Sequence, residues 1–162
     1  VERMGYAEFA KQASKAGVDG LLTVDLPPEE SADLDKELKA ADIHNIFLIA
    51  PTTSNERIAH VTANATGFIY YVSLKGVTGA ANIDLDSVAE KVDAIRQTTN
   101  LPVMVGFGIK DGASAKAASQ NADGAVIGSV LVKLMEQGST EHITQRISEC
   151  IADIRSGLDS SV

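Results

Sequence analysis

Short apolar runs alternate with helical patterns along the whole sequence, and this alternation limits the possible folds most. Five runs have the character of strands, at residues 20–24, 46–50, 67–72, 102–109 and 124–127. They are apolar throughout, which is typical of parallel strands covered on both faces. The sequence therefore predicts an α/β protein built on a parallel sheet.

Amphipathic periodicity fills the segments between these runs. Helices are expected over 5–16, from the Pro28 turn to Ala41, behind a Thr53–Glu56 capping box, and over 86–98 and 112–121. Isoleucines spaced three or four residues apart between 143 and 154 predict a last helix that ends at Gly157. Residues 73–84 are expected to form a long loop.

Two of the strand regions resemble each other, and their repetition favours a barrel. "VDGLLTVD" (18–25) and "ADGAVIGS" (122–129) share Asp-Gly before the apolar run and a short polar residue after it. Such repetition favours a TIM (β/α)8 barrel over a doubly wound sheet, and no G-x-G-x-x-G follows a strand to support dinucleotide binding. Since a complete barrel has eight strands and about 250 residues, this chain is expected to be either an open sheet or the last five units of a barrel.

Composition excludes several classes of protein. The chain has 162 residues, a formal net charge of −8 and a pI of about 4.8, which argues against nucleic-acid binding. No apolar run approaches the length of a membrane span, and no signal peptide is visible. The single cysteine fits a reducing compartment, so a cytoplasmic protein is expected. Because a helical pattern begins almost at Val1, the chain is expected to be a fragment of a longer protein.

Glycines dominate the predicted carboxyl ends of the last two strands, where a barrel places its site. Gly108 closes one strand, and Gly128-Ser129 follow the next, directly before a helical run. Glycine lets a ligand approach the backbone closely, and a helix start offers unpaired N–H groups and a positive dipole end. The pattern predicts a phosphate site at Gly108, Gly128 and Ser129. The alternative is that these glycines only permit tight turns.

Other candidate residues carry weaker signals. The three histidines are expected at the surface, and Cys150 is expected to pack as a small side chain on the last helix. No H-x-x-H, C-x-x-C or G-x-S-x-G pattern is present, so neither a metal site nor acyl transfer is predicted. Tyr70 and Tyr71 must point to opposite faces of their strand, and spacing alone leaves open which of them faces the barrel interior.

Four segments together resemble the tryptophan synthase alpha subunit family: "GVDGLLTVDLPPEES", "FIYYVSLKGVTGA", "VMVGFGIKDG" and "GAVIGSVLVK". They occur in family order and spacing over the whole chain. The resemblance implies that residues 1–162 are the C-terminal part of a single (β/α)8 barrel domain. It also implies a lyase of tryptophan biosynthesis that cleaves indole-3-glycerol phosphate to indole and glyceraldehyde 3-phosphate.

The resemblance also implies site residues and a partner. Substrate contacts are implied for Tyr70, Thr78, Gly79, Phe107, Gly108, Gly128 and Ser129. Asp25 and Pro27 match the loop that faces the beta subunit in an alpha2-beta2 tetramer. Pyridoxal phosphate belongs to that beta subunit, so no cofactor is expected on this chain.

The family's two catalytic carboxylates precede the part that this chain resembles. No catalytic residue is therefore assigned, and the chain alone is expected to be inactive. Two alternatives remain open: another phosphate-binding barrel isomerase or synthase, and a non-catalytic module that binds the beta subunit.

Overall fold

In the part of the chain that the structure describes, the sheet contains five parallel strands in sequential order. The computed structural model describes residues 1–72, 85–106, 108–137 and 139–160. Within them the strand order is β1-β2-β3-β4-β5, and every neighbouring pair is parallel. The strands are β1 (Gly20–Leu22), β2 (His44–Ile49), β3 (Ile69–Val72), β4 (Val103–Gly106) and β5 (Gly124–Val126). The predicted parallel α/β architecture is confirmed, and its order lacks the reversal of a doubly wound sheet.

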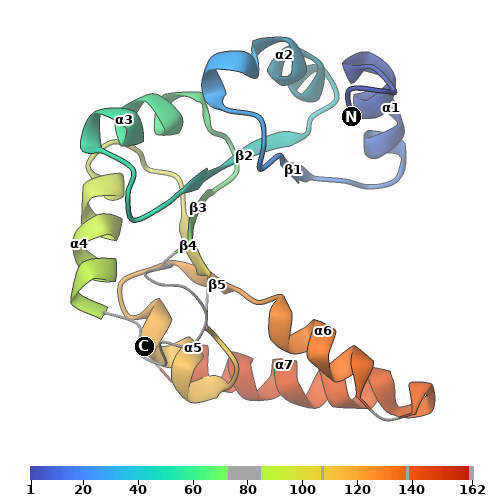
Figure 1. The fold of residues 1–162 in the computed structure, drawn as a ribbon, viewed down its shortest axis with the longest axis vertical. Helices are drawn as coiled ribbons and strands as arrows, with labels where there is room; N and C mark the ends of the chain where they lie inside the picture. Colours follow the sequence, from blue (N-terminus) through green and yellow to red (C-terminus); the bar gives the residue numbers. More distant parts are fainter. Residues whose placement is uncertain (73–84, 107, 138, 161–162) are drawn as a thin grey trace.

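Helices form an arc around one side of this curved sheet, and the described helices leave the opposite, concave side open between α1 and α6 (Figure 1). The result is half of a barrel. The helical elements are α1 (Tyr6–Lys15), η1 (Pro28–Glu30), α2 (Ala32–Ala40), α3 (Asn55–Asn64), α4 (Leu85–Arg96), α5 (Gly112–Ser119), α6 (Ser129–Glu136), η2 (Thr140–His142) and α7 (Ile143–Asp159).

The main core lies between the sheet and the helices. The strand residues turned toward the helices are buried: Phe47, Ile49, Ile69, Tyr71, Val103 and Val105. Successive strand side chains point to opposite faces, so Leu48, Tyr70 and Met104 face the concave side, where they are half-buried. This placement answers the open question about the two tyrosines: Tyr71 packs against the helices and Tyr70 faces the barrel interior.

Two predicted helix ends are wrong. Ser54, not Thr53, caps α3, because Ser54 Oγ accepts the Arg57 N–H at 3.3 Å. The Thr53 hydroxyl is already occupied, since it accepts the Ala50 N–H at 3.1 Å. At the other end of the chain, α7 continues through Gly157 to Asp159. Gly157 serves a helix crossing, because a methyl group there would lie 2.6 Å from Gly112 Cα on α5.

The lone side chains singled out from the sequence behave as predicted. The three histidines are exposed, although His44 begins β2 and does not lie in a loop or helix. Cys150 is half-buried and packs against the main core. Within the described ranges no helix is long and apolar enough to cross a membrane. The same ranges hold no cluster of three or more His, Cys, Asp or Glu side chains placed to bind a metal.

Candidate functional site

The carboxyl ends of β4 and β5 place the predicted phosphate residues at neighbouring strand exits. Gly106 of β4 is paired with Val126 of β5. Gly108 and Gly128 each follow two residues later, and adjacent strands lie about 4.8 Å apart. Ser129 then begins α6 directly behind Gly128. Gly108, Gly128 and Ser129 are all exposed at this edge of the sheet.

The N-terminus of α6 is open to an anion. Gly128 is the N-cap residue, and among the described residues no side chain caps the first turn. The Gly128 carbonyl accepts the N–H groups of Leu131 and Val132 at 3.0 and 3.2 Å, which starts the helix. The first N–H groups of a helix lack intrahelical partners and lie at the positive end of its dipole. An anion near Gly128 and Ser129 would meet both.

The N-terminus of α5 is closed by contrast. Asp111 Oδ1 accepts the Ser114 N–H at 2.8 Å, and the Asp153 carboxylate of α7 accepts the Gly112 N–H at 2.7 Å. Hydrogen bonds from the Ser114 side chain and backbone hold the pKa of Asp111 below its ordinary value, so this group stays ionised. Because two carboxylates already occupy this helix end, it repels a further anion. Of the two neighbouring helices, α6 is the one that can accept phosphate.

Gly108 and Gly128 differ in backbone conformation. Gly108 has φ +71°, a left-handed conformation that favours glycine, so a tight turn explains it. Gly128 has φ −132°, and a methyl group there would meet no described atom within 4 Å. The φ of Gly128 is not left-handed, and no described atom crowds the position. Among the described residues nothing fills the space in front of this uncapped helix end, which favours a ligand there.

Tyr70 is the fourth candidate that the structure brings to this region. It lies on β3, next to β4, with its ring on the concave face. Partial burial raises the pKa of its phenol, which therefore stays protonated at neutral pH and can donate a hydrogen bond. The ring occupies the space beside Gly106, where a methyl group would lie 2.5 Å from Cε2 and 2.8 Å from Cζ.

The two predicted interface residues lie far from this region. Asp25 and Pro27 follow β1, at the opposite edge of the sheet from β5. Four strand spacings of about 4.8 Å make roughly 19 Å along the sheet. Asp25 is exposed, and Pro27 is the residue before η1. They belong to a separate surface. Three further predicted residues, Thr78, Gly79 and Phe107, lie outside the described residues.

An ion pair missed by the sequence analysis anchors the loop that carries Asp25 and Pro27. Arg57 of α3 donates two hydrogen bonds to the Glu29 carboxylate of η1, at 2.6 and 3.3 Å. Its guanidinium lowers the pKa of Glu29. The 28-residue separation leaves no local signal of the pairing in the sequence.

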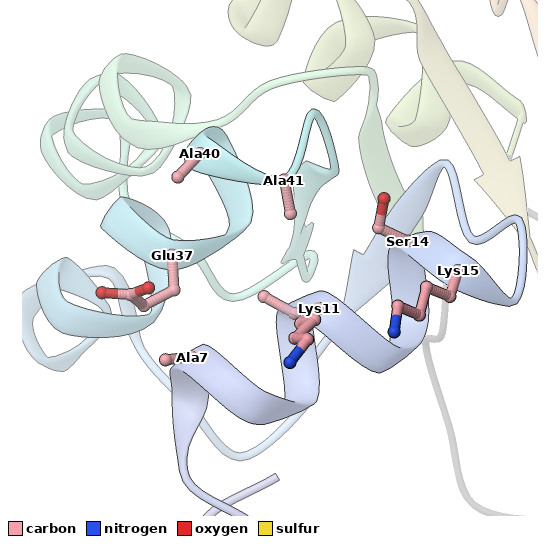
Figure 2. Close-up of a pocket in the computed structure, with 8 residues that line it drawn as sticks. Ala7, Lys11, Ser14, Lys15, Glu37, Ala40 and Ala41 are labelled. Carbon is pink, nitrogen blue, oxygen red and sulfur yellow. The ribbon is translucent and has the colours of Figure 1, made fainter.

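Three hollows of the described part lie away from the strand exits. A groove of about 410 Å³ runs between α1 and α2, with Lys11, Lys15 and Glu37 around it (Figure 2). Two more lie near the amino-terminal ends of β2 and β4. None of the three is lined by a predicted site residue, and we assign them no ligand.

A half barrel of parallel strands, with an uncapped helix directly behind its last strand, defines the class. It is the (β/α)8-barrel class, in which ligands bind at the carboxyl ends of the strands.

Comparison with known proteins then gives the family. The family model "Tryptophan synthase alpha chain" matches residues 1–158, and this chain belongs to that family. The tryptophan synthase alpha chain of Ralstonia nicotianae is 55% identical over 160 residues, covering 99% of this chain and 60% of the relative. That of Paraburkholderia phytofirmans is 50% identical, covering 99% of this chain and 59% of the relative. The chain thus spans about 60% of the length of these curated relatives.

Solved structures agree. A Mycobacterium tuberculosis tryptophan synthase structure superposes with a TM-score of 0.85 at 33% identity, covering 98% of this chain and 58% of that one. The tryptophan synthase alpha subunit from Campylobacter jejuni superposes with a TM-score of 0.82 at 36% identity, covering 92% of this chain and 60% of that one. The prediction of five units of a (β/α)8 barrel is confirmed.

Proposed function

We propose that residues 1–162 are the phosphate-binding and substrate-binding half of a tryptophan synthase alpha subunit, the C-terminal part of one barrel domain. The complete subunit is a lyase that cleaves indole-3-glycerol phosphate into indole and glyceraldehyde 3-phosphate. The observation that carries the proposal is the uncapped start of α6 at Gly128-Ser129, in a chain whose family model matches residues 1–158.

The phosphate is held by backbone donors. The N–H groups of Gly108, Gly128 and Ser129 point to it, and the Ser129 hydroxyl donates as well. No Lys or Arg stands at these three positions, so the α6 dipole supplies the positive potential. The carboxylates at the start of α5 exclude the anion from that helix end.

The rest of the substrate lies toward the barrel interior. The Tyr70 phenol donates a hydrogen bond to the substrate from the concave face. Thr78, Gly79 and Phe107 make the other substrate contacts, assigned from their positions in the family motifs. We assign no catalytic residue and no cofactor to these 162 residues. They bind the substrate's phosphate without cleaving its carbon skeleton.

The partner is a tryptophan synthase beta subunit in an alpha2-beta2 tetramer, which carries the pyridoxal phosphate. Asp25 and Pro27 face it. The Glu29–Arg57 ion pair holds the loop of these residues against α3.

Calorimetric titration of the chain with glycerol 3-phosphate and with glycerol tests the site. We expect saturable binding of the phosphate ester and none of glycerol. Gly128→Val should abolish the binding while the circular dichroism spectrum stays unchanged. Equal heats for the two ligands, or full binding by Gly128→Val, would overturn the proposal.

A second candidate is a non-catalytic module that docks on the beta subunit, with Asp25 and Pro27 on a surface at the opposite edge of the sheet from β5. A joined protein separates the candidates. It places the portion of the Ralstonia relative that this chain does not cover ahead of Val1. The lyase proposal predicts indole release from indole-3-glycerol phosphate by the joined protein. The docking module predicts that the 162-residue chain alone alters conversion of indole to tryptophan by the beta subunit. Another barrel isomerase or synthase predicts neither.

A further inference from the structure

Helix α7 carries a row of residues turned toward the two elements that flank the phosphate site. Arg146, Cys150, Asp153 and Gly157 are separated by four, three and four residues, which places them on one helix face. Gly157 packs against Gly112 of α5, and Cys150 packs against the main core. This face is therefore the one that α7 presents to the rest of the molecule.

Arg146 holds the far end of α6. Its Nε and Nη2 donate to the Leu134 carbonyl at 3.4 and 3.3 Å, and its Nη1 and Nη2 donate to the Ser139 carbonyl at 3.3 Å each. Leu134 lies in the last turn of α6, where carbonyl groups lack intrahelical partners. A cation is also favourable at this negative end of the helix dipole. Arg146 thus fixes α6 at the end opposite Gly128.

Asp153 holds the start of α5. Its Oδ2 accepts the Gly112 N–H at 2.7 Å across a separation of 41 residues. The helices touch backbone to backbone here, since a methyl group on Gly112 would lie 2.7 Å from the Asp153 carbonyl oxygen. The segment that leaves β4 at Gly106 and carries Gly108 is therefore fixed where it enters α5.

We propose that Arg146 and Asp153 are positioning residues of the phosphate site, with α7 setting the start of α6 relative to the Gly108 turn. The inference rests on the proposed function. A helix of eight residues has little stability of its own, so its direction depends on what holds it. A site made of backbone N–H groups depends on that direction, because hydrogen bonds weaken steeply when misaligned.

Binding of glycerol 3-phosphate to the 162-residue chain tests the role. Arg146→Gln and Asp153→Ala should each raise Kd by about three- to tenfold, the range that loss of a well-aimed helix end implies. Asp153→Asn should keep most of the affinity, because its amide oxygen can still accept the Gly112 N–H. Arg146→Lys should keep only part of the affinity, because an ammonium group lacks the planar guanidinium geometry that donates to two carbonyls at once.

The Arg155–Asp159 ion pair of the same helix offers matched controls. Both side chains are exposed, at 65% and 59%. Arg155→Gln and Asp159→Ala make the same charge changes and should leave Kd unchanged. Charge alone makes the opposite prediction for Asp153→Ala, because removing a carboxylate should strengthen anion binding. Weaker binding in this variant therefore supports positioning over long-range electrostatics.

The outcomes separate this inference from the proposed function. No binding of glycerol 3-phosphate by the unaltered chain would overturn both. Binding that Gly128→Val abolishes but that Arg146→Gln and Asp153→Ala leave intact would overturn the positioning role alone. Tighter binding by Asp153→Ala, or a lower unfolding temperature with unchanged Kd, would overturn it as well. If the alanine variant does not fold, a loss of affinity in folded Asp153→Asn as large as tenfold would contradict the proposed hydrogen bond.

Discussion

The ring of Tyr70 fills the space that a side chain at Gly106 would need. A methyl group on Gly106 would lie 2.5 Å from Cε2 and 2.8 Å from Cζ of the tyrosine on the neighbouring strand. The same relationship recurs on the concave face, where Met104 covers Gly124 and Ile46 covers Gly20. Large side chains lying over glycines line the inside of a narrow barrel without crowding it.

Gly106→Ala should therefore destabilise the protein and displace the Tyr70 ring. Overpacking of this kind costs about 1–3 kcal/mol, which urea unfolding can measure. Gly124→Ala is the matched control, because a methyl group there meets the flexible Met104 side chain at 2.6 Å and should cost less. Adding Tyr70→Leu should recover part of the loss at Gly106. Equal losses for the two alanine variants, with no recovery, would show that the tyrosine is not the obstacle.

Acid should weaken the start of α5 through Asp111. Its folded-state pKa is lowered from 3.8 by hydrogen bonds with Ser114. A depressed carboxyl pKa contributes stability that is fully present above the unfolded value and is lost as pH falls through the folded value. Asp111→Asn should therefore destabilise the chain at about pH 6 and much less at about pH 2.5, in urea unfolding at both values. Asp93→Asn, an exposed change of equal charge on α4, is the control. A loss independent of pH would contradict the capping role of the ionised form.

Sequence patterns predicted the sheet well because they are local. Continuous apolar runs identified the five strands of the described residues, although within the run at 102–109 the described strand is Val103–Gly106. Glycines and a following helical run likewise marked Gly128-Ser129 without knowledge of the fold. The confirmed strands therefore depend on neighbours a few residues apart, and the phosphate role of Gly128-Ser129 stays a prediction.

Features that depend on distant contacts were wrong or missed. Gly157 was expected to end a helix, yet it lies inside α7 because Gly112 packs against it. Arg146 and Asp153 had no sequence signal, since Gly112 lies 41 residues from Asp153. The prediction of the α3 cap was wrong for another reason. Thr53 and Ser54 are adjacent residues with hydroxyl groups, and the backbone conformation decides which hydroxyl reaches the helix.

The 162-residue chain alone should self-associate or bind a hydrophobic dye. Among the described residues β1 and β5 each pair with one strand only, and unpaired edges recruit other strands. The concave face also leaves apolar side chains such as Leu48 and Met104 only half-buried. Light scattering and dye fluorescence measure both effects. A dye-silent monomer that unfolds cooperatively would contradict the expectation.

The 162 residues alone should not release indole from indole-3-glycerol phosphate at the rate of a complete alpha subunit. General acid–base groups typically contribute about 10²–10⁴-fold each, and no residue here is assigned such a role. Phosphate binding lowers the chemical barrier only if it strengthens in the transition state. An indole-release assay on the purified chain checks this, and a rate near that of the Ralstonia relative would refute it.

Gly128→Val and Ser129→Ala should separate phosphate affinity from indole affinity in a joined protein completed by the Ralstonia portion. Ser129→Ala removes one neutral donor, a loss of about 0.5–1.5 kcal/mol. Gly128→Val should be far worse, because its branched side chain would occupy the space in front of the α6 dipole. The fold should tolerate the valine, since a methyl group at 128 meets no described atom within 4 Å. Both variants should weaken the binding of glyceraldehyde 3-phosphate and leave the affinity for indole nearly unchanged. Titration with each ligand measures both affinities. Equal weakening of indole by Gly128→Val, with the fold intact, would mean that Gly128 is a turn former and not a phosphate residue.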